Sequence, residues 1–257
     1  MTFYKYQGTG NDFVIVDNRL QYINKKDTKR IATLCDRRFG IGADGFILLE
    51  NDKNVDFKMV YYNADGNEST MCGNGGRCIV AFAKFLNIIE NETEFIAIDG
   101  LHKAKIEDGL VHLQMQDVSE IESYENHMFL DTGSPHHVEI VSGLKDFEVK
   151  SNGETIRNGA PYNEAGSNVN FVEQLSTENF AVRTYERGVE DETLSCGTGV
   201  TAVALAMHKS GKTKADKISL QTQGGPLNVT FSTNDNGYDN IWLIGPAVQV
   251  FKGEIEW

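Results

Sequence analysis

The chain has 257 residues, of which 40% are hydrophobic and 24% are charged, as in an ordinary globular protein. This length predicts one large domain or two modest ones, and the composition excludes collagen, a coiled coil and disorder as descriptions of the whole chain. The formal net charge of −13 excludes the basic surface that attracts phosphate backbones or anionic lipids, so we expect neither nucleic acid nor a membrane surface as a partner.

The start of the chain carries no targeting signal, because residues 1–8 lack a basic region followed by an apolar stretch. The best apolar runs, at 78–86 and 200–207, are about half the ~20 residues that a membrane-spanning helix needs. We therefore expect a cytoplasmic protein.

Short runs rich in β-branched and aromatic residues predict many strands along the chain. In chain order they are 13–17, 46–49, 57–62, 94–98, 111–115, 138–141, 171–173, 181–185, 218–221, 227–231 and 241–244. Helices are predicted at 29–37, 76–86 and 199–210. The last two are apolar on nearly all sides, which indicates helices enclosed within a domain.

The sequence resembles itself at an offset of about 123 residues. A Thr-Gly-polar turn that leads into an apolar run stands at 9–11 and again at 132–134, and a Cys-Gly-x-Gly run stands at 72–75 and again at 196–199. Landmarks that recur in the same order predict two copies of one domain.

We therefore predict an α+β fold of two pseudo-symmetric lobes, each a barrel-like β-sheet around a buried central helix. The first lobe would comprise 1–117, joined by a C-terminal strand at about 246–257, and the second 118–245.

Each Cys-Gly-x-Gly run lies where a strand-loop segment gives way to a predicted helix. Free N–H groups at a helix N-terminus bind anions, and the same dipole lowers a thiol pKa from about 8.5. A thiolate on one side of a carbon atom and a thiol on the other would invert that carbon, as an epimerase or racemase does. A single such turn is compatible with a packed, structural cysteine, whereas a pair in register across a repeat favours chemistry.

The remaining cysteines, Cys35 and Cys78, are expected to be packed in the core. The spacing between Cys72 and Cys78 matches no common zinc site, and no histidine stands close by in sequence, so we expect no metal. No signal for pyridoxal phosphate is present, and we expect no cofactor.

The motifs resemble those of the diaminopimelate epimerase family over nearly the whole chain. The matching segments are 8–13, 40–45, 63–66, 71–78, 185–188 and 195–199, and the Cys-Gly-Asn-Gly-Gly-Arg-Cys run at 72–78 is highly specific. The chain departs from the common pattern at Ser134, where many members have Asn, and at Gly45, where some have Gln.

The resemblance implies a cofactor-independent epimerase that interconverts LL- and meso-diaminopimelate in lysine and peptidoglycan precursor synthesis, usually as a homodimer. It implies that Cys72 and Cys196 are the two catalytic bases and that His136, with Glu186, aligns or poises the reacting centre.

The resemblance also implies two sets of substrate-binding groups. The distal amino-acid end of the substrate would be bound by Asn11, Asn63, Asn168, Glu186 and Arg187. The backbone N–H groups of Gly73, Asn74, Gly197 and Thr198 would bind the reacting carboxylate.

Simpler interpretations exist for several of these residues. Asn11 and Asn63 stand in turn-like sequence, an adjacent Glu-Arg pair is usually solvated, and His136 follows a proline and could bond to a loop backbone. Two alternative functions stay open on the sequence: a racemase of another amino acid, such as histidine, and a non-catalytic amino-acid-binding or thiol redox protein.

Overall fold

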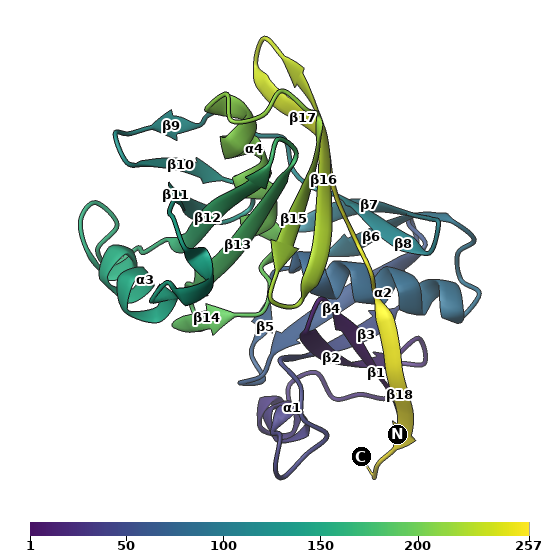
Figure 1. Ribbon diagram of the computed structural model, residues 1–257. Helices are drawn as coiled ribbons and strands as arrows, with labels where there is room; N and C mark the ends of the chain where they lie inside the picture. Colours follow the sequence, from purple (N-terminus) through teal and green to yellow (C-terminus); the bar gives the residue numbers. More distant parts are fainter. Residues whose placement is uncertain (257) are drawn as a thin grey trace. The chain divides into compact units, whose positions relative to one another are not determined.

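The computed structural model describes residues 1–256, and the chain divides into two units (Figure 1). The first unit comprises Met1–Leu113 and the segment that starts at Gly245, and the second comprises Gln114–Ile244. The expected boundaries near 117 and 246 lie within four residues of these divisions.

Two helices and a mixed sheet make up the first unit. Its helices are α1 (Thr28–Cys35) and α2 (Gly73–Phe85). Its strands are β1 (Thr2–Gly8), β2 (Asn11–Asp17), β3 (Gly45–Glu50), β4 (Phe57–Asn63), β5 (Glu68–Ser69), β6 (Glu92–Ala97), β7 (Gly100–Glu107), β8 (Leu110–Gln114) and β18 (Val248–Glu254). Strands β2 and β3 pair in parallel, as do β4 and β6, and the other pairings are antiparallel.

The second unit has the same kind of composition. Its helices are α3 (Val149–Asn158) and α4 (Gly197–Lys209), with a short 3-10 turn, η1, at Leu144–Asp146. Its strands are β9 (Glu122–Ser123), β10 (His127–Asp131), β11 (Pro135–Ile140), β12 (Asn168–Ser176), β13 (Asn179–Glu186), β14 (Asp191–Thr193), β15 (Lys217–Thr222), β16 (Gly225–Asn234) and β17 (Gly237–Gly245).

The pairing pattern of the first unit recurs in the second. In the first unit β1, β2, β3, β4, β6, β7 and β8 pair in that order, and the short strand β5 pairs with β4. In the second unit β10, β11, β12, β13, β15, β16 and β17 pair in the same order and directions, and β14 pairs with β13. The internal repeat read from the sequence is therefore a repeat of topology.

The central helix of each unit is enclosed by strands. α2 contacts β1, β2, β3, β7 and β18, and α4 contacts β10, β11, β12, β13, β15 and β16. From Gly197 to Met207 every residue of α4 except Thr198 is buried, because Ala, Val and Leu side chains cover all its faces. No helix within residues 1–256 is long and apolar enough to cross a bilayer.

The α+β class, with a buried helix in each of two repeated units, is confirmed. The predicted helices at 29–37, 76–86 and 199–210 correspond to α1, α2 and α4, although α2 and α4 begin two or three residues earlier than predicted. The earlier start matters because it makes Cys72 and Cys196 the N-cap residues of the two helices.

Helix α3 was missed because its sequence contains Asn152-Gly153, a typical turn signal. Gly153 is present for packing: a Cβ there would lie 2.3 Å from Cβ of Tyr185 on the neighbouring strand β13. Strands β1, β7 and β10 and the short strands β5, β9 and β14 were also missed, since local pattern alone did not separate them from loops.

Helix α4 should be a main source of stability in the second unit. We expect Leu205→Ala, which removes a fully buried side chain, to lower the free energy of unfolding by about 2–5 kcal/mol. The matched change Leu175→Ala, at a side chain that is 52% exposed, should lower it by less than about 0.5 kcal/mol. Urea denaturation monitored by circular dichroism compares the two variants, and equal effects would contradict a packed role for α4.

Candidate active site

Cys72 caps the N-terminus of α2 with its side chain. Its backbone is extended, and its Sγ accepts a hydrogen bond from the N–H of Gly75 at 3.2 Å. The Gly76 N–H bonds the Cys72 carbonyl at 2.8 Å, which starts the helix. The sulfur therefore lies at the positive end of the helix dipole, where a negative charge is stabilised.

Arg77 lies wholly buried behind this turn. Its guanidinium donates to the Gly73 carbonyl at 3.3 Å, to Thr9 Oγ1 at 3.1 Å and to Asn74 Oδ1 at 3.0 Å, and its Nε donates to the Pro246 carbonyl at 3.4 Å. No salt bridge joins it to a carboxylate within residues 1–256.

The surroundings of Arg77 change the pKa of its guanidinium. Burial lowers the pKa of Arg77 to about 10, and the electrostatic coupling of Arg77 to the thiol groups of Cys78 and Cys72 opposes that shift. Electrostatic interaction is mutual, so the guanidinium in turn favours the thiolate of Cys72.

Asn11 lies beside Asn74, which is in the first turn of α2. Asn74 Nδ2 donates to Asn11 Oδ1 at 3.3 Å, and Asn11 Nδ2 donates to Asp44 Oδ2 at 2.7 Å. Asn63, at the exposed end of β4, has no hydrogen-bond partner for its side chain within residues 1–256. The Asn63 amide is thus free to donate to and accept from a ligand.

Asp12, next to Asn11, anchors this corner through ion pairs. It pairs with Lys5 at 2.7 Å and with Arg37 at 2.7 Å, and Arg37 also pairs with Asp44. Burial alone would raise the pKa of Asp12, but the hydrogen bonds and charges of Arg37 and Lys5 lower it to about 2. The carboxylate therefore stays ionised and keeps the β1–β2 hairpin in place.

Cys196 caps α4 without the backbone bond that Cys72 accepts. Its Sγ instead lies 3.4 Å from the hydroxyl of Thr198, two residues into the helix. The side chain of Thr132 donates to the Thr198 carbonyl at 2.9 Å and so fixes this first turn against the end of β10. Cys196 is buried, being 6% exposed.

His136 is fully buried between two polar side chains. Its Nε2 lies 3.0 Å from Ser134 Oγ, and its Nδ1 lies 3.1 Å from Asn170 Nδ2. Burial lowers the pKa of His136 to about 3, and the nearby charge of Arg187 adds to the shift. The imidazole is therefore neutral over the physiological pH range and bonds to side chains rather than to the loop backbone.

Asn168 positions the segment that follows β13. Its Oδ1 accepts from the backbone N–H of Arg187 at 2.9 Å, and its Nδ2 donates to Ser134 Oγ at 3.1 Å and to the Pro135 carbonyl at 3.0 Å. Both amide hydrogens are therefore occupied within the unit. Arg187 is exposed, and its Nη1 donates to the Ala165 carbonyl at 3.0 Å. Within residues 1–256 its other side-chain N–H groups have no hydrogen-bond partner, so they can donate to a ligand.

The second glycine of each Cys-Gly-x-Gly run is required by close packing. A Cβ at Gly199 would lie 2.5 Å from Asn170 Oδ1, and a Cβ at Gly75 would lie 3.1 Å from Cys72 Sγ. These glycines let a polar side chain and a sulfur approach the helix backbone.

The remaining cysteines have inert surroundings. All four cysteines are free; Cys35 and Cys78 are buried. Burial raises the pKa of Cys35 to about 12 and raises that of Cys78 further, so both stay protonated. Within residues 1–256 no cluster of three or more His, Cys, Asp or Glu side chains could hold a metal ion.

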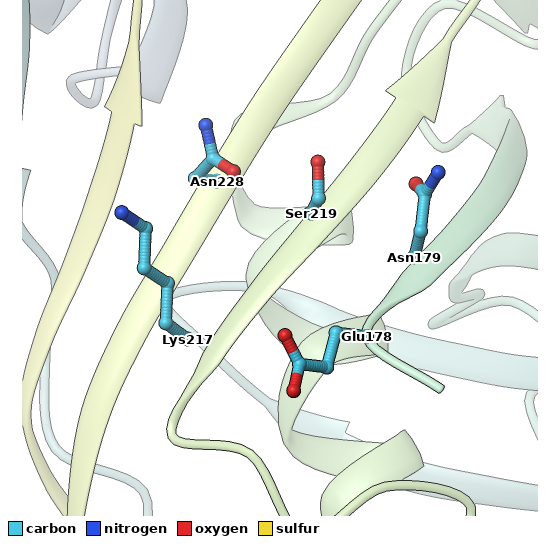
Figure 2. A pocket seen from close by; sticks show the side chains of 5 residues that line it. All are labelled: Glu178, Asn179, Lys217, Ser219 and Asn228. Atoms are coloured by element: carbon cyan, nitrogen blue, oxygen red, sulfur yellow. The ribbon is translucent and has the colours of Figure 1, made fainter. Parts of the chain in front are cut away.

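A polar depression of about 240 Å³ lies elsewhere in the second unit. Figure 2 shows its lining side chains, which belong to β13, β15, β16 and the turn before β13: Glu178, Asn179, Lys217, Ser219 and Asn228. Asn179 begins β13 whereas Glu186 ends it, so the depression is at the opposite end of that strand from the candidate site.

The sequence reasoning did not single out Arg77 or Asn170 as site residues. A signal for Asn170 was present, because it lies two residues after Asn168 and so on the same face of a strand. Arg77 stands in the specific run at 72–78 and in a helix predicted to be enclosed, but an arginine in a helix is ordinarily exposed.

The family model described as "Diaminopimelate epimerase" matches residues 3–120 and 128–250. A diaminopimelate epimerase of Flavobacterium psychrophilum is 60% identical over 256 residues, which is 99% of this chain and 100% of that protein. A diaminopimelate epimerase of Chlorobaculum tepidum is 40% identical and covers 96% of this chain and 98% of its own.

Solved structures show the same fold at low sequence identity. A phenazine biosynthesis protein of the PhzF family from Bacillus anthracis has a TM-score of 0.81 at 12% identity and covers 100% of this chain and 99% of its own. A probable proline racemase from Agrobacterium radiobacter has a TM-score of 0.69 at 15% identity, covering 99% and 92%.

Arg77 should control the reactivity of Cys72. We expect Arg77→Met to slow alkylation of Cys72 by iodoacetamide at pH 7 several-fold, because the thiolate loses a buried cation. The control Lys29→Met removes an exposed cation of the same unit and should leave the rate unchanged. Mass spectrometry of the Cys72 peptide measures the rate, and a wild-type rate in Arg77→Met would contradict this role.

Proposed function

The chain belongs to the diaminopimelate epimerase family, and we propose that it interconverts LL- and meso-diaminopimelate without a cofactor. The observation that carries the mechanism is the repeated position of two cysteines, each the N-cap of the buried helix of its unit. We propose Cys72 and Cys196 as the two bases.

Inversion moves one proton from one face of Cα and returns another to the opposite face. One cysteine, as thiolate, takes the α-proton and becomes a thiol, while the other, as thiol, donates its proton and becomes a thiolate. Proton count and charge balance, and the enzyme ends with its two protonation states exchanged. Each sulfur must therefore be stable as a thiolate, which the Gly75 N–H and Arg77 support at Cys72 and a helix N-terminus supports at both.

The α-carboxylate is the group on which charge develops as the proton leaves. We propose that the N–H groups of Gly73 and Asn74, with those of Gly197 and Thr198, bind it. They lie in the first turns of α2 and α4, where backbone N–H groups point out of the helix. His136, which is neutral and buried, would position groups near the reacting centre rather than carry a charge.

The distal end of the substrate is a second ammonium-carboxylate pair. We propose that Arg187 binds its carboxylate, Glu186 its ammonium, and Asn63 and Asn11 its remaining hydrogen-bonding groups. The free N–H groups of Arg187 and the unoccupied amide of Asn63 support these roles. Asn168 would act by holding the Arg187 backbone in place.

We further propose that the protein is cytoplasmic and acts as a homodimer, with diaminopimelate feeding lysine and peptidoglycan precursor synthesis. The four free cysteines suit a reducing compartment. Strand β18 supports the homodimer, because Val248 and Val250 are 46% and 57% exposed on an edge strand that pairs only with β1 among the described residues. Light scattering after size-exclusion chromatography tests the assembly, and a mass near that of one chain would refute it.

The two-base assignment predicts the effect of replacing either cysteine. We expect Cys72→Ser and Cys196→Ser each to lower the epimerisation rate by at least about a hundredfold, because serine does not ionise near neutral pH. Proton NMR in deuterium oxide, without added cofactor, measures loss of the α-proton of LL-diaminopimelate and appearance of the meso isomer. Cys35→Ser, at a buried cysteine outside the site, is the control. An undiminished rate in either catalytic variant would overturn the assignment.

The distal contacts predict substrate selectivity. We expect Arg187→Met to raise KM for diaminopimelate at least about tenfold, because the carboxylate loses its charged partner. A substrate that lacks the distal carboxylate, such as lysine, should be a poor substrate of both the wild-type protein and the Arg187→Met variant. The same NMR assay with both substrates decides this, and a wild-type KM in Arg187→Met would favour a racemase of another amino acid.

A further inference from the structure

A hydrogen-bond relay of polar side chains links Cys196 to the core of the second unit. Cys196 Sγ lies 3.4 Å from Thr198 Oγ1, which lies 3.4 Å from Ser134 Oγ, which lies 3.0 Å from His136 Nε2. The relay continues from His136 Nδ1 to Asn170 Nδ2, 3.1 Å away. Each hydroxyl can donate or accept, so the donor-to-acceptor direction of the relay has to be established from the end whose orientation is fixed.

Asn170 is that fixed end. Its Nδ2 donates to the His137 carbonyl at 2.9 Å, and a carbonyl can only accept. Its Oδ1 is held by the hydroxyl of Thr184 at 3.0 Å. The orientation of the Asn170 amide is thereby determined, and the same Nδ2 must also donate to His136.

The His136 tautomer follows from this bond. Because His136 Nδ1 accepts from Asn170, the single proton of the neutral imidazole is on Nε2. Nε2 then donates to Ser134 Oγ. The ring stays neutral over the pH range in which thiols titrate, because burial and the Arg187 charge lower the pKa of His136 to about 3.

Ser134 determines the direction of the next hydrogen bond in the relay. Its Oγ accepts from His136 Nε2 and from Asn168 Nδ2, and the orientation of Asn168 is in turn fixed by the Pro135 carbonyl. With both lone pairs engaged, the hydroxyl of Ser134 donates its own proton, and Thr198 Oγ1 is the remaining partner. Thr198 therefore accepts from Ser134 and directs its proton at the Cys196 sulfur.

We propose that Ser134, Thr198 and Asn170 are positioning residues that aim a hydroxyl donor at Cys196 and so stabilise its thiolate. The 3.4 Å between Ser134 Oγ and Thr198 Oγ1 is long for a hydrogen bond between oxygens, whereas 3.4 Å is an ordinary distance for a hydrogen bond to the larger sulfur atom. A thiolate accepts such a bond more strongly than a thiol does. The proposal rests on the proposed function only in that Cys196 acts as one of the two bases.

Different groups surround the cysteine of the first unit. Asn74 occupies the position in α2 that Thr198 occupies in α4, and its amide bonds to Arg77 and Asn11. Cys72 receives a backbone N–H from Gly75, whereas Cys196 makes no such cap bond. At Cys196 it is the Thr198 hydroxyl that lies within hydrogen-bond distance of the sulfur.

The test is the pH dependence of Cys196 alkylation by iodoacetamide, without substrate, followed by mass spectrometry of the Cys196 peptide. Thr198→Val keeps the backbone N–H and the shape but removes the hydroxyl, and it should raise the midpoint of the profile by about one pH unit. Thr198→Ser retains the hydroxyl and should restore the wild-type midpoint. A wild-type midpoint in Thr198→Val would overturn the proposal.

A matched control lies in the same helix. Thr201 is buried, and its hydroxyl donates to the Gly197 carbonyl at 3.0 Å, so Thr201 is not part of the relay. Thr201→Val should leave the midpoint unchanged. An equal shift in both variants would mean that the start of the helix, rather than the relay, was perturbed, and would overturn the proposal. The charged residues of the candidate site in this unit, Glu186 and Arg187, are the same in every variant, so a difference in midpoint between variants does not come from replacing them.

The direction of the relay has its own readout. Nitrogen-15 NMR of the wild-type protein should show the proton of His136 on Nε2, and a proton on Nδ1 would overturn the assignment. In Asn170→Asp the new carboxylate can only accept, so the proton should move to Nδ1 and the Cys196 midpoint should rise.

These measurements separate the two proposals. A shifted midpoint in a protein that does not act on LL-diaminopimelate would uphold the relay and refute the proposed function. Turnover of LL-diaminopimelate with an unshifted midpoint in Thr198→Val would do the opposite.

Discussion

Each unit depends on one constraint at the start of its central helix. A helix that is apolar on nearly every side must be enclosed by the sheet, yet its first N–H groups have no partner inside the helix. In both units a cysteine occupies the capping position, and a glycine three residues later leaves room for it or for a polar neighbour. The feature that solves a folding problem thus also places a sulfur at the positive end of a dipole.

The two copies differ in what lies beside the sulfur. In the first unit a backbone N–H bonds the Cys72 sulfur, and the buried guanidinium of Arg77 bonds the Gly73 carbonyl and interacts electrostatically with Cys72. In the second unit Thr201 bonds the equivalent Gly197 carbonyl, and a hydroxyl approaches Cys196 instead. In the proposed mechanism each sulfur serves as base in one direction, so two unlike environments would have to achieve comparable thiolate stability.

Much of the architecture could be predicted, because it is written in local patterns. The buried helices show in their uniform apolarity, the repeat shows in its recurring motifs, and most of the central strands show in their β-branched runs. The prediction failed where packing overrides local preference: the turn-like sequence of α3 is helical, and Gly153 there packs against Tyr185. The predicted C-terminal strand, β18, is exposed along most of its length and pairs with β1. Of the candidate site, the cysteines and the Glu-Arg pair at 186–187 were proposed from motifs and spacing.

The sequence by itself determined the kind of chemistry: two cysteines, each ahead of a glycine-containing helix start, in a repeated and acidic chain. Only the tertiary structure decided which polar groups surround each sulfur. Arg77 is buried because Thr9 and Pro246, far away in sequence, supply acceptors for it, and His136 holds its proton on Nε2 because Asn170 on a neighbouring strand fixes the ring. The direction of a hydrogen bond depends on partners that the fold brings together, and no local pattern of residues encodes it.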